Sequence, residues 1–247
     1  MKVLVVGATG QLGSKLVQKK NEFSADLQIK ALVRRNSNYQ RLDCSKDDLI
    51  FGDLTDKPSL IAACQGIDFV ISTATVVFPR GQSNFEDDER QGYKNLVEAC
   101  EYCGVKQIIF ISVAVEFEPI FIKRSKTYEL KQWCEELLID SKLTHTILRC
   151  PLFMDDYFAL IGSQIPLKGE QLATISRSTG LTKLFNRITC DSVEKYGVAW
   201  IPGAPSNRHA FISVEDVANY CIKVTGNREY YNRTLKIGGP ENLSWNE

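Results

Sequence analysis

The chain lacks the features that mark several large classes of protein. Its 30 Lys and Arg residues are balanced by 30 Asp and Glu residues, so no net charge is available to attract nucleic acid or an anionic membrane surface. No apolar run approaches the length of a membrane span. Residues 1–6 already read as a strand and lack the charged start and the cleavage site of a signal peptide. We therefore expect neither nucleic-acid binding nor a membrane-spanning segment.

Metal-binding and disulfide patterns are also scarce. The two histidines, His145 and His209, stand too far apart in sequence to indicate a metal site, and no metal is expected. The eight cysteines are scattered in mostly apolar surroundings, which favours reduced, buried thiols in a cytoplasmic protein. Cys100 and Cys103 form a CxxC pair, but no second Cys or His pair lies near it, so a redox or zinc role is not expected.

The most informative stretch lies at the start of the chain. An apolar strand over residues 2–6 runs into Gly7, Gly10 and Gly13, and an amphipathic helix over 11–20 follows. This arrangement brings backbone N–H groups and a helix N-terminus against a pyrophosphate. Gly7 would allow the tight turn, Gly10 would let phosphates approach the backbone, and Gly13 would let the helix pack closely on the strand. The stretch predicts dinucleotide binding, the alternative being a βαβ unit that has lost its ligand. The predicted contacts are Gly7, Thr9, Gly10, Gln11, Leu12 and Gly13.

Apolar runs alternate with helical patterns through the first 150 residues. Strands are expected over 2–6, 28–33, 48–51, 67–72, 107–112 and 144–148, and helices over 11–20, 58–64, 86–103 and 121–141. Short β-branched runs between amphipathic helices indicate a parallel sheet that is covered on both faces. Right-handed crossovers then give a doubly wound order. We therefore predict an α/β fold with a dinucleotide-binding Rossmann domain over residues 1–150.

The pattern changes after Pro151 to shorter elements and frequent turn signals. A helix over 214–224 and a strand over 234–237 are expected. We interpret residues 151–247 as a smaller substrate-side lobe that is interwoven with the sheet, at the edge where such folds bind ligands. Ser244 and Glu247 form a capping-box pattern that would start a helix. Because the chain stops there, either this lobe is truncated or the protein ends unusually early.

The second expected strand ends in two arginines, Arg34 and Arg35, with no acidic residue. A protein that prefers NAD usually places an acidic side chain here against the ribose 2′-hydroxyl, whereas an arginine pairs with a 2′-phosphate. The arginines favour NADP(H), with Arg34 the better candidate and Arg35 the second. The alternative is that both are solvated loop charges.

Further candidate nucleotide contacts follow the third and fourth strands. Asp53, next to Leu54, is placed either to accept the adenine amino group or to cap the turn before the next helix, and both interpretations stand. The fourth strand ends in the small residues Thr73, Ala74 and Thr75, which would let the backbone pass near the ribose and pyrophosphate.

Acidic residues at two expected helix starts have a simple interpretation. The run over 86–89 opens the long helix, and carboxylates in a first turn suit the helix dipole. We interpret this run as a solvated helix start rather than a metal site. Asp216 lies near the start of the 214–224 helix, where a capping or first-turn role is sufficient.

Taken together, the motifs resemble the NmrA-like branch of the atypical short-chain dehydrogenase/reductases. The resemblance covers nearly the whole chain and rests on the order and spacing of residues 7–13, 33–34, 52–54, 104–112, 131, 143–153 and 211–218. It implies an NAD(P)-binding Rossmann fold. The family includes NADPH-dependent phenylpropanoid, isoflavone and quinone reductases, NADP-sensing regulators without known turnover, and photosystem assembly factors. The resemblance therefore implies a cofactor more firmly than a reaction.

The resemblance also places candidate catalytic residues. Ordinary members of the superfamily use a Ser, a Tyr and a Lys four residues after the Tyr. Ser112 fits the first position and Lys131 the last, but Thr127 stands where the Tyr is expected, and its hydroxyl is too weak an acid to replace a phenol. Reductases of this branch also lack the Tyr. By resemblance, Lys131 would hold the nicotinamide ribose and polarise a substrate oxygen. The alternative is a solvent-facing helix lysine.

Residues around the sixth expected strand have two interpretations. Relatives place the segment after this strand against the nicotinamide, which makes Pro151 and Phe153 candidate ring contacts, while core packing is the alternative. His145 lies on the strand itself and is interpreted as packed. His209 lies in a loop and is a weaker candidate for facing the substrate.

Two functions follow. Ser112 and Lys131 favour an NADPH-dependent oxidoreductase acting on a small carbonyl, quinone or enone. The missing Tyr favours a non-catalytic NADP(H) sensor, regulator or assembly factor that acts through a protein partner. A nucleotide-sugar epimerase is disfavoured because it too needs the Tyr. The oligomeric state stays open.

The arginine pair predicts the preferred nucleotide. A binding titration should give tighter binding of NADPH than of NADH, because only NADPH carries the 2′-phosphate that an arginine can pair with. Equal affinity for the two nucleotides would overturn the assignment.

Overall fold

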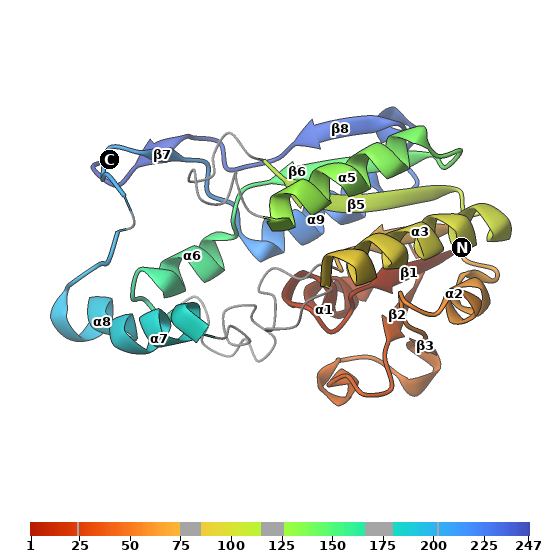
Figure 1. Ribbon diagram of the computed structural model, residues 1–247, viewed down its shortest axis with the longest axis horizontal. Helices are drawn as coiled ribbons and strands as arrows, with labels where there is room; N and C mark the ends of the chain where they lie inside the picture. The colour runs from red at the N-terminus through yellow and green to blue at the C-terminus, as the bar shows by residue number, and fades with distance from the viewer. Residues whose placement is uncertain (24, 75–84, 115–125, 166–179, 202) are drawn as a thin grey trace.

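The main feature of the computed structural model is a seven-stranded parallel sheet (Figure 1). The structure describes residues 1–247 except 24, 75–84, 115–125, 166–179 and 202. The strand order is β3-β2-β1-β4-β5-β6-β8, and every pairing in this sheet is parallel. The strands are β1 (Lys2–Val6), β2 (Gln28–Val33), β3 (Leu49–Phe51), β4 (Phe69–Ser72), β5 (Gln107–Val113), β6 (His145–Cys150) and β8 (Arg233–Lys236). All carboxyl ends therefore lie at one edge, and the predicted doubly wound α/β fold is confirmed.

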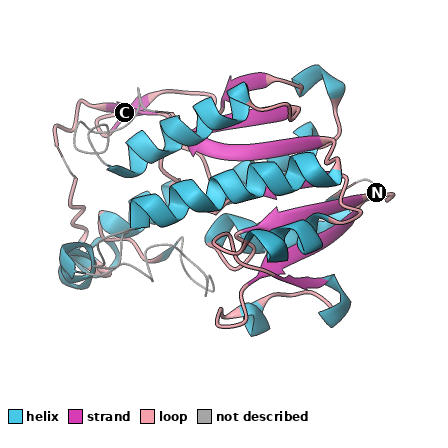
Figure 2. Ribbon diagram, turned by 45° about the vertical axis from the view of Figure 1, so that its right-hand side comes forward, coloured by secondary structure: helices cyan, strands magenta, loops and turns pink. Residues whose placement is uncertain are grey.

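Helices cover both faces of this sheet, with α1 (Gln11–Gln18) and α9 (Val214–Val224) on one face and α2 (Lys57–Cys64), α3 (Phe85–Cys103) and α5 (Lys126–Asp140) on the other. The helices α6 (Met154–Leu160), α7 (Gly180–Thr189) and α8 (Ser192–Tyr196) lie to one side of the sheet in Figure 1. Val3 and Val5 of β1 join a buried cluster with α1 and α9, whereas Leu4 and Val6 join a second cluster with α2, α3 and α5. This alternation explains why the strand reads as a continuous apolar run. Figures 1 and 2 show α3 and α5 side by side across the second face.

The sequence predicted most element positions to within a few residues. The first helix is shorter than expected, because residues Lys19–Glu22 tighten into a 3-10 turn. In that turn, the buried Lys19 amine forms ion pairs with Glu22 and with Glu215 of α9. Further 3-10 turns are Tyr39–Arg41, Lys46–Asp48 and Arg228–Tyr230. The helix predicted over 121–141 is described from Lys126 onward.

The second half of the chain contributes to the main sheet. Strand β8 pairs with β6, and α9 packs on α1. The fully buried Gln107 side chain links these parts, because its amide nitrogen donates to Thr146 Oγ1 at 2.8 Å and to the Val224 carbonyl at 3.1 Å, and its oxygen accepts from the Gly226 N–H at 2.8 Å. Ser213 caps α9 through the Asp216 N–H, which confirms the first-turn role of Asp216. The division at residue 150 stays a prediction.

An aromatic cluster holds the last residues against α6. Trp245 stacks on Tyr157 with ring centroids 5.5 Å apart and meets Phe211 edge-on at 5.6 Å. Phe158 and His209 complete the cluster, so His209 is packed among rings. The strands β7 (Arg208–His209) and β9 (Leu243–Ser244) pair antiparallel beside it. The Ser244 N–H donates to the Glu247 carboxylate at 3.0 Å, as in a capping box, but the expected helix start is wrong, because Ser244 ends β9 and residues 245–246 form a turn.

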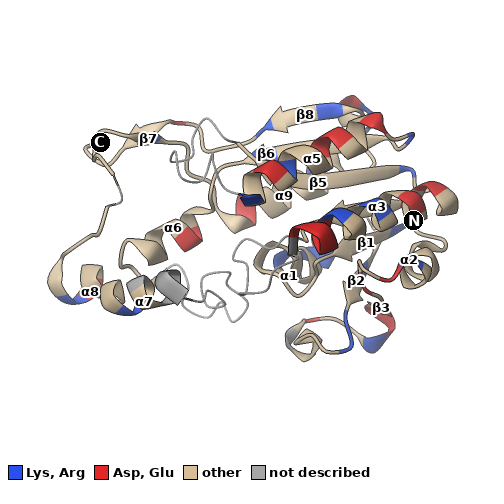
Figure 3. Ribbon diagram, in the orientation of Figure 1, with Lys and Arg blue, Asp and Glu red and all other residues tan. Residues whose placement is uncertain are grey.

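The charge on the main described helices is mixed in sign apart from the acidic run over 86–89 at the start of α3 (Figure 3). Within the described ranges, no helix is both long and apolar enough to cross a membrane. Acidic and basic residues are interspersed along α3 and α5 (Figure 3).

Candidate functional site

The glycine turn after β1 lies at the carboxyl edge of the sheet, next to the end of β4. Gly7 has a φ of +83°, the left-handed region that favours glycine. A Cβ on Gly7 would lie 2.8 Å from both the Ala74 nitrogen and the Thr73 hydroxyl. That hydroxyl donates to the Val6 carbonyl at 3.0 Å, so the end of β4 is fastened directly to the turn. Gly7 therefore forms the tight turn that the sequence predicts.

Helix α1 approaches this turn closely. A Cβ on Gly13 would overlap the Gly7 carbonyl oxygen and lie 2.8 Å from Ala8 Cα, so the close packing that requires glycine is against the turn rather than the strand. Gly10 is the N-cap, provides no side-chain cap, and is followed by a first turn without acidic residues. The positive end of the helix is thus not neutralised by its own first turn, which suits an anionic ligand.

The two arginines follow β2 at the same edge, and both are exposed. The Arg35 guanidinium lies 4.9 Å above the Phe51 ring, which meets Tyr39 edge-on at 5.4 Å. The backbone carbonyl of Arg34 accepts a hydrogen bond from the Ser37 hydroxyl. The assignment of a 2′-phosphate to Arg34 or Arg35 stays a prediction.

Asp53 caps a turn. Its Oδ1 accepts from the Thr55 N–H and the Thr55 hydroxyl, each at 2.9 Å, while the Asp53 N–H donates to Ser59 Oγ at 3.0 Å. The capping interpretation is confirmed, and the adenine contact stays a prediction. Helix α3 supports the next residue, because the Asn95 amide donates to the Leu54 carbonyl at 2.9 Å.

Tyr93 of α3 is a site residue that the sequence analysis missed. Its hydroxyl donates to the Ala74 carbonyl at 2.5 Å and lies 3.0 Å from Ser72 Oγ. Complete burial raises the pKa of Tyr93 well above its ordinary value, so the phenol keeps its proton. Together with Thr73, it fixes the segment that lies against Gly7. Its position on the buried face of the predicted helix was the available signal. Thr75 lies outside the described residues.

Lys131 of α5 is buried at the carboxyl end of β5. Only 4% of the residue is exposed, so the solvent-facing interpretation is wrong. Its amine donates to the Ile111 carbonyl at 2.9 Å and lies 4.5 Å from the centre of the Phe110 ring. Burial lowers the pKa of Lys131, against the opposing effect of nearby acidic groups, first among them Glu89. Thr127 lies one turn earlier on the same helix and is half-buried.

Glu89 corrects one sequence interpretation. Residues 86–88 are half-buried or exposed, as a solvated helix start requires, but Glu89 is only 7% exposed. The solvated interpretation is wrong for this residue, because Glu89 lies beyond the first turn, where the helix turns its side chain inward, toward the charge of Lys131.

Ser112 of β5 belongs to a buried polar chain. Its hydroxyl donates to Glu135 of α5, and Arg149 of β6 donates to the same carboxylate, with Nε 3.1 Å from each oxygen. Glu135 was missed by the sequence analysis. Its spacing of four residues from Lys131 was the available signal, because such residues share a helix face. Cofactor contact and catalysis by Ser112 and Lys131 stay predictions.

The segment after β6 packs into the core. Phe153 lies against the buried cluster under α1 and α9, and the N–H of Met154 donates to the Ile212 carbonyl at 2.9 Å. Core packing of Phe153 is thus confirmed, and Pro151 is buried beside it. Contact of either residue with a nicotinamide stays a prediction.

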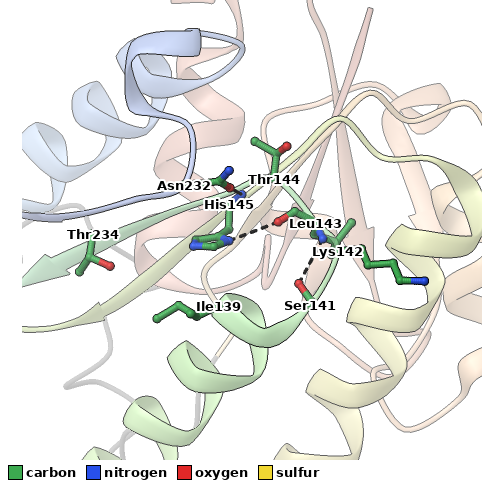
Figure 4. Close-up of a pocket in the computed structure, with 8 residues that line it drawn as sticks. All are labelled: Ile139, Ser141, Lys142, Leu143, Thr144, His145, Asn232 and Thr234. Atoms are coloured by element: carbon green, nitrogen blue, oxygen red, sulfur yellow. Dashed lines mark hydrogen bonds between the residues drawn. The ribbon is translucent and has the colours of Figure 1, made fainter.

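A hollow of about 480 Å³ lies at the opposite edge of the sheet (Figure 4). It is at the amino end of β6, and it contains none of the predicted nucleotide contacts. His145 lines it and places its Nδ1 3.2 Å from the Leu143 carbonyl, in keeping with the packed role predicted for this histidine. The lining residues are Ile139, Ser141, Lys142, Leu143, Thr144, His145, Asn232 and Thr234.

Comparison with known proteins agrees with this geometry. Residues 7–179 match the profile of a family described as NAD(P)H-binding. The chain is 27% identical, over its whole length, to the photosystem II assembly factor Ycf39 of Cyanophora paradoxa, and it spans 65% of that relative's length. It is 30% identical, over 60% of its length, to the uncharacterized sugar epimerase YhfK of Bacillus subtilis, covering 71% of that protein.

The fold is also that of a solved reductase. The Citrobacter sp. triphenylmethane reductase, crystallised in complex with NADP(H), superposes with a TM-score of 0.69 at 20% identity. The match covers 99% of this chain and 72% of that chain. At this identity, the likeness shows the fold.

The glycine turn predicts that two alanine substitutions will behave differently. Gly13→Ala should lower both the melting temperature and the affinity for NADPH, because its Cβ would overlap the Gly7 carbonyl. Gly10→Ala should weaken NADPH binding by about tenfold or more, because its Cβ would stand where the phosphates approach. Its effect on the melting temperature should be smaller than that of Gly13→Ala, because the Cβ would meet only the Gly7 carbonyl, at 3.1 Å. Thermal melts and fluorescence titrations measure both quantities. Unchanged NADPH affinity in Gly10→Ala would contradict the assignment.

Proposed function

This chain belongs to the NAD(P)H-binding family, and from that premise we propose that it is an NADPH-dependent oxidoreductase acting on a small carbonyl, quinone or enone. The observation that carries the proposal is the buried Lys131 amine at the carboxyl end of β5. A buried cation costs free energy, and its retention at the edge where this fold binds ligands fits a functional role.

The nucleotide would lie across the glycine turn. The pyrophosphate would meet the N-terminus of α1, and the 2′-phosphate would meet Arg34 or Arg35. Gly7, Thr73 and Ala74, which are packed together, would line the ribose side. Asp53 would approach the adenine with the carboxylate oxygen that does not accept from Thr55.

Bound NADPH would supply the hydride, and Lys131 would supply the proton. The Lys131 ammonium has three N–H donors, of which one reaches Ile111. A second would bind the ribose, and the third would polarise the substrate oxygen and protonate it as the hydride reaches carbon. The lowered pKa of Lys131 makes it a stronger acid than an ordinary lysine, which suits this task.

The eight cysteines support a reducing compartment. All of them lie in the described part of the chain as free thiols, most of them buried. Disulfides are rare in the cytoplasm, so we place the protein there.

A second function has its own support. The likeness to Ycf39 runs over the whole chain, and Thr127 stands where a catalytic phenol is expected. A non-catalytic NADP(H)-binding assembly factor or sensor, acting through a protein partner, would need the nucleotide site without turnover. The likeness to YhfK, a protein named as a sugar epimerase, supports an epimerase function less, because epimerisation also needs the phenol. NADPH oxidation against a panel of quinones and aldehydes separates the two, since binding without turnover on any acceptor supports the second function.

Lys131 is the direct test of the reductase proposal. Lys131→Met should reduce turnover by at least about 100-fold, because general acid catalysis contributes that much or more. The change keeps the apolar length of the side chain but removes the positive charge that faces the buried Glu89. A thermal melt therefore checks the fold, and Lys131→Met/Glu89→Gln replaces the single variant if that variant is unfolded.

Lys126→Met is the matched control for this test. Lys126 is on the same helix, and its side chain is 69% exposed. Turnover by Lys131→Met at the level of this control would rule out a chemical role for Lys131.

A further inference from the structure

Two consecutive turns of α5 are fastened to two consecutive residues of β5. Lys131 donates to the carbonyl of Ile111, and one turn later Glu135 accepts from the hydroxyl of Ser112. Glu135 also binds Arg149 of β6, so one carboxylate ties the helix to both strands. This register sets where along β5 the Lys131 amine lies.

The same contacts determine what Ser112 can do. A serine hydroxyl carries one proton. Both oxygens of Glu135 accept from the Arg149 guanidinium, which can only donate, and 5% of the Glu135 side chain is exposed. Ser112 donates its one proton to the same carboxylate. Toward a ligand, Ser112 then offers lone pairs and no donor.

The charges around Lys131 form a formally neutral group that is buried except for Arg149, whose side chain is 37% exposed. Glu89 approaches from α3, Glu135 and the Cys134 thiol from α5 itself, and the Cys150 thiol from β6. Arg149 balances the second carboxylate. Buried charges are tolerated when they are paired in this way, and the removal of one partner leaves the other uncompensated.

We propose that Glu135 is a positioning residue, which fixes the turn that carries Lys131 and takes the only proton of Ser112, so that Lys131 is the hydrogen-bond donor to the substrate oxygen. The inference rests on the proposed reductase function. It assigns Ser112, a candidate catalytic residue by family resemblance, to binding a ligand N–H or O–H.

The test compares three variants in NADPH oxidation with an acceptor that the wild type reduces. Glu135→Gln should lower kcat by about tenfold or more with little change in KM, because the acid is misplaced rather than the substrate. Ser112→Ala should lower kcat by less than about tenfold. If Ser112 donated a proton to the substrate, its loss would lower kcat by about 100-fold or more. Glu136→Gln is the matched control, because Glu136 is the next residue and is exposed.

The pH profile separates positioning from a purely structural role. Turnover should fall as pH rises through the pKa of Lys131, because the acid must carry its proton. Glu135 raises that pKa, so Glu135→Gln should move the fall to lower pH, while Glu136→Gln should not. An unmoved profile in Glu135→Gln, or a loss in Ser112→Ala equal to that in Lys131→Met, would overturn the proposal.

Two further measurements keep the test decisive. If Glu135→Gln alone does not fold, the double variant Glu135→Gln/Arg149→Met removes both charges of the pair and is used in its place. If the wild type turns over no acceptor, the reductase function and the substrate role of Lys131 fail, and NADPH affinity then decides whether Glu135 positions Lys131. Glu135→Gln should then bind NADPH about fivefold or more weakly than Glu136→Gln, and equal affinity would overturn it.

Discussion

The close approach of α1 to the turn after β1 is the constraint on which the carboxyl edge of the sheet, where we propose that the nucleotide binds, depends. No side chain fits at Gly13, and none fits at Gly7, where the end of β4 is in contact. β1 pairs with β2 on one side and with β4 on the other, so the turn lies where the order of the strands reverses. The helix N-terminus thereby lies at the carboxyl edge beside this reversal, which is where an open parallel α/β sheet binds its ligands.

The second organising element is the buried charge group beside β5. Burial of Lys131 disfavours its charged form, and its position at the strand end depends on contacts from α3, α5 and β6 together. A solvated lysine would not need Glu89 and Glu135 to lie in the interior. The glycine turn and this charge group lie at the same edge of the sheet, and we propose that the first binds phosphates and the second the reacting end of a nucleotide.

The sequence predicts the parts of this arrangement that are local. Strand and helix positions follow from apolar periodicity, and the turn at Gly7 follows from glycine spacing. Lys131 was found by family resemblance, and its burial was not foreseen. Tyr93 and Glu135 were missed because their partners, Ala74 and Arg149, are brought to them by the tertiary fold. Glu89 was misjudged for the same reason, since an acidic run gives no sign of which member faces inward.

The central claim is that the turn and the charge group bind opposite ends of one NADPH molecule. A crystal structure with NADPH tests it most directly. We expect the pyrophosphate against the N-terminus of α1 and Lys131 Nζ within hydrogen-bond distance of the nicotinamide ribose. A nucleotide bound across the glycine turn with its nicotinamide ribose remote from Lys131, or one bound in the hollow beside His145, would contradict the account.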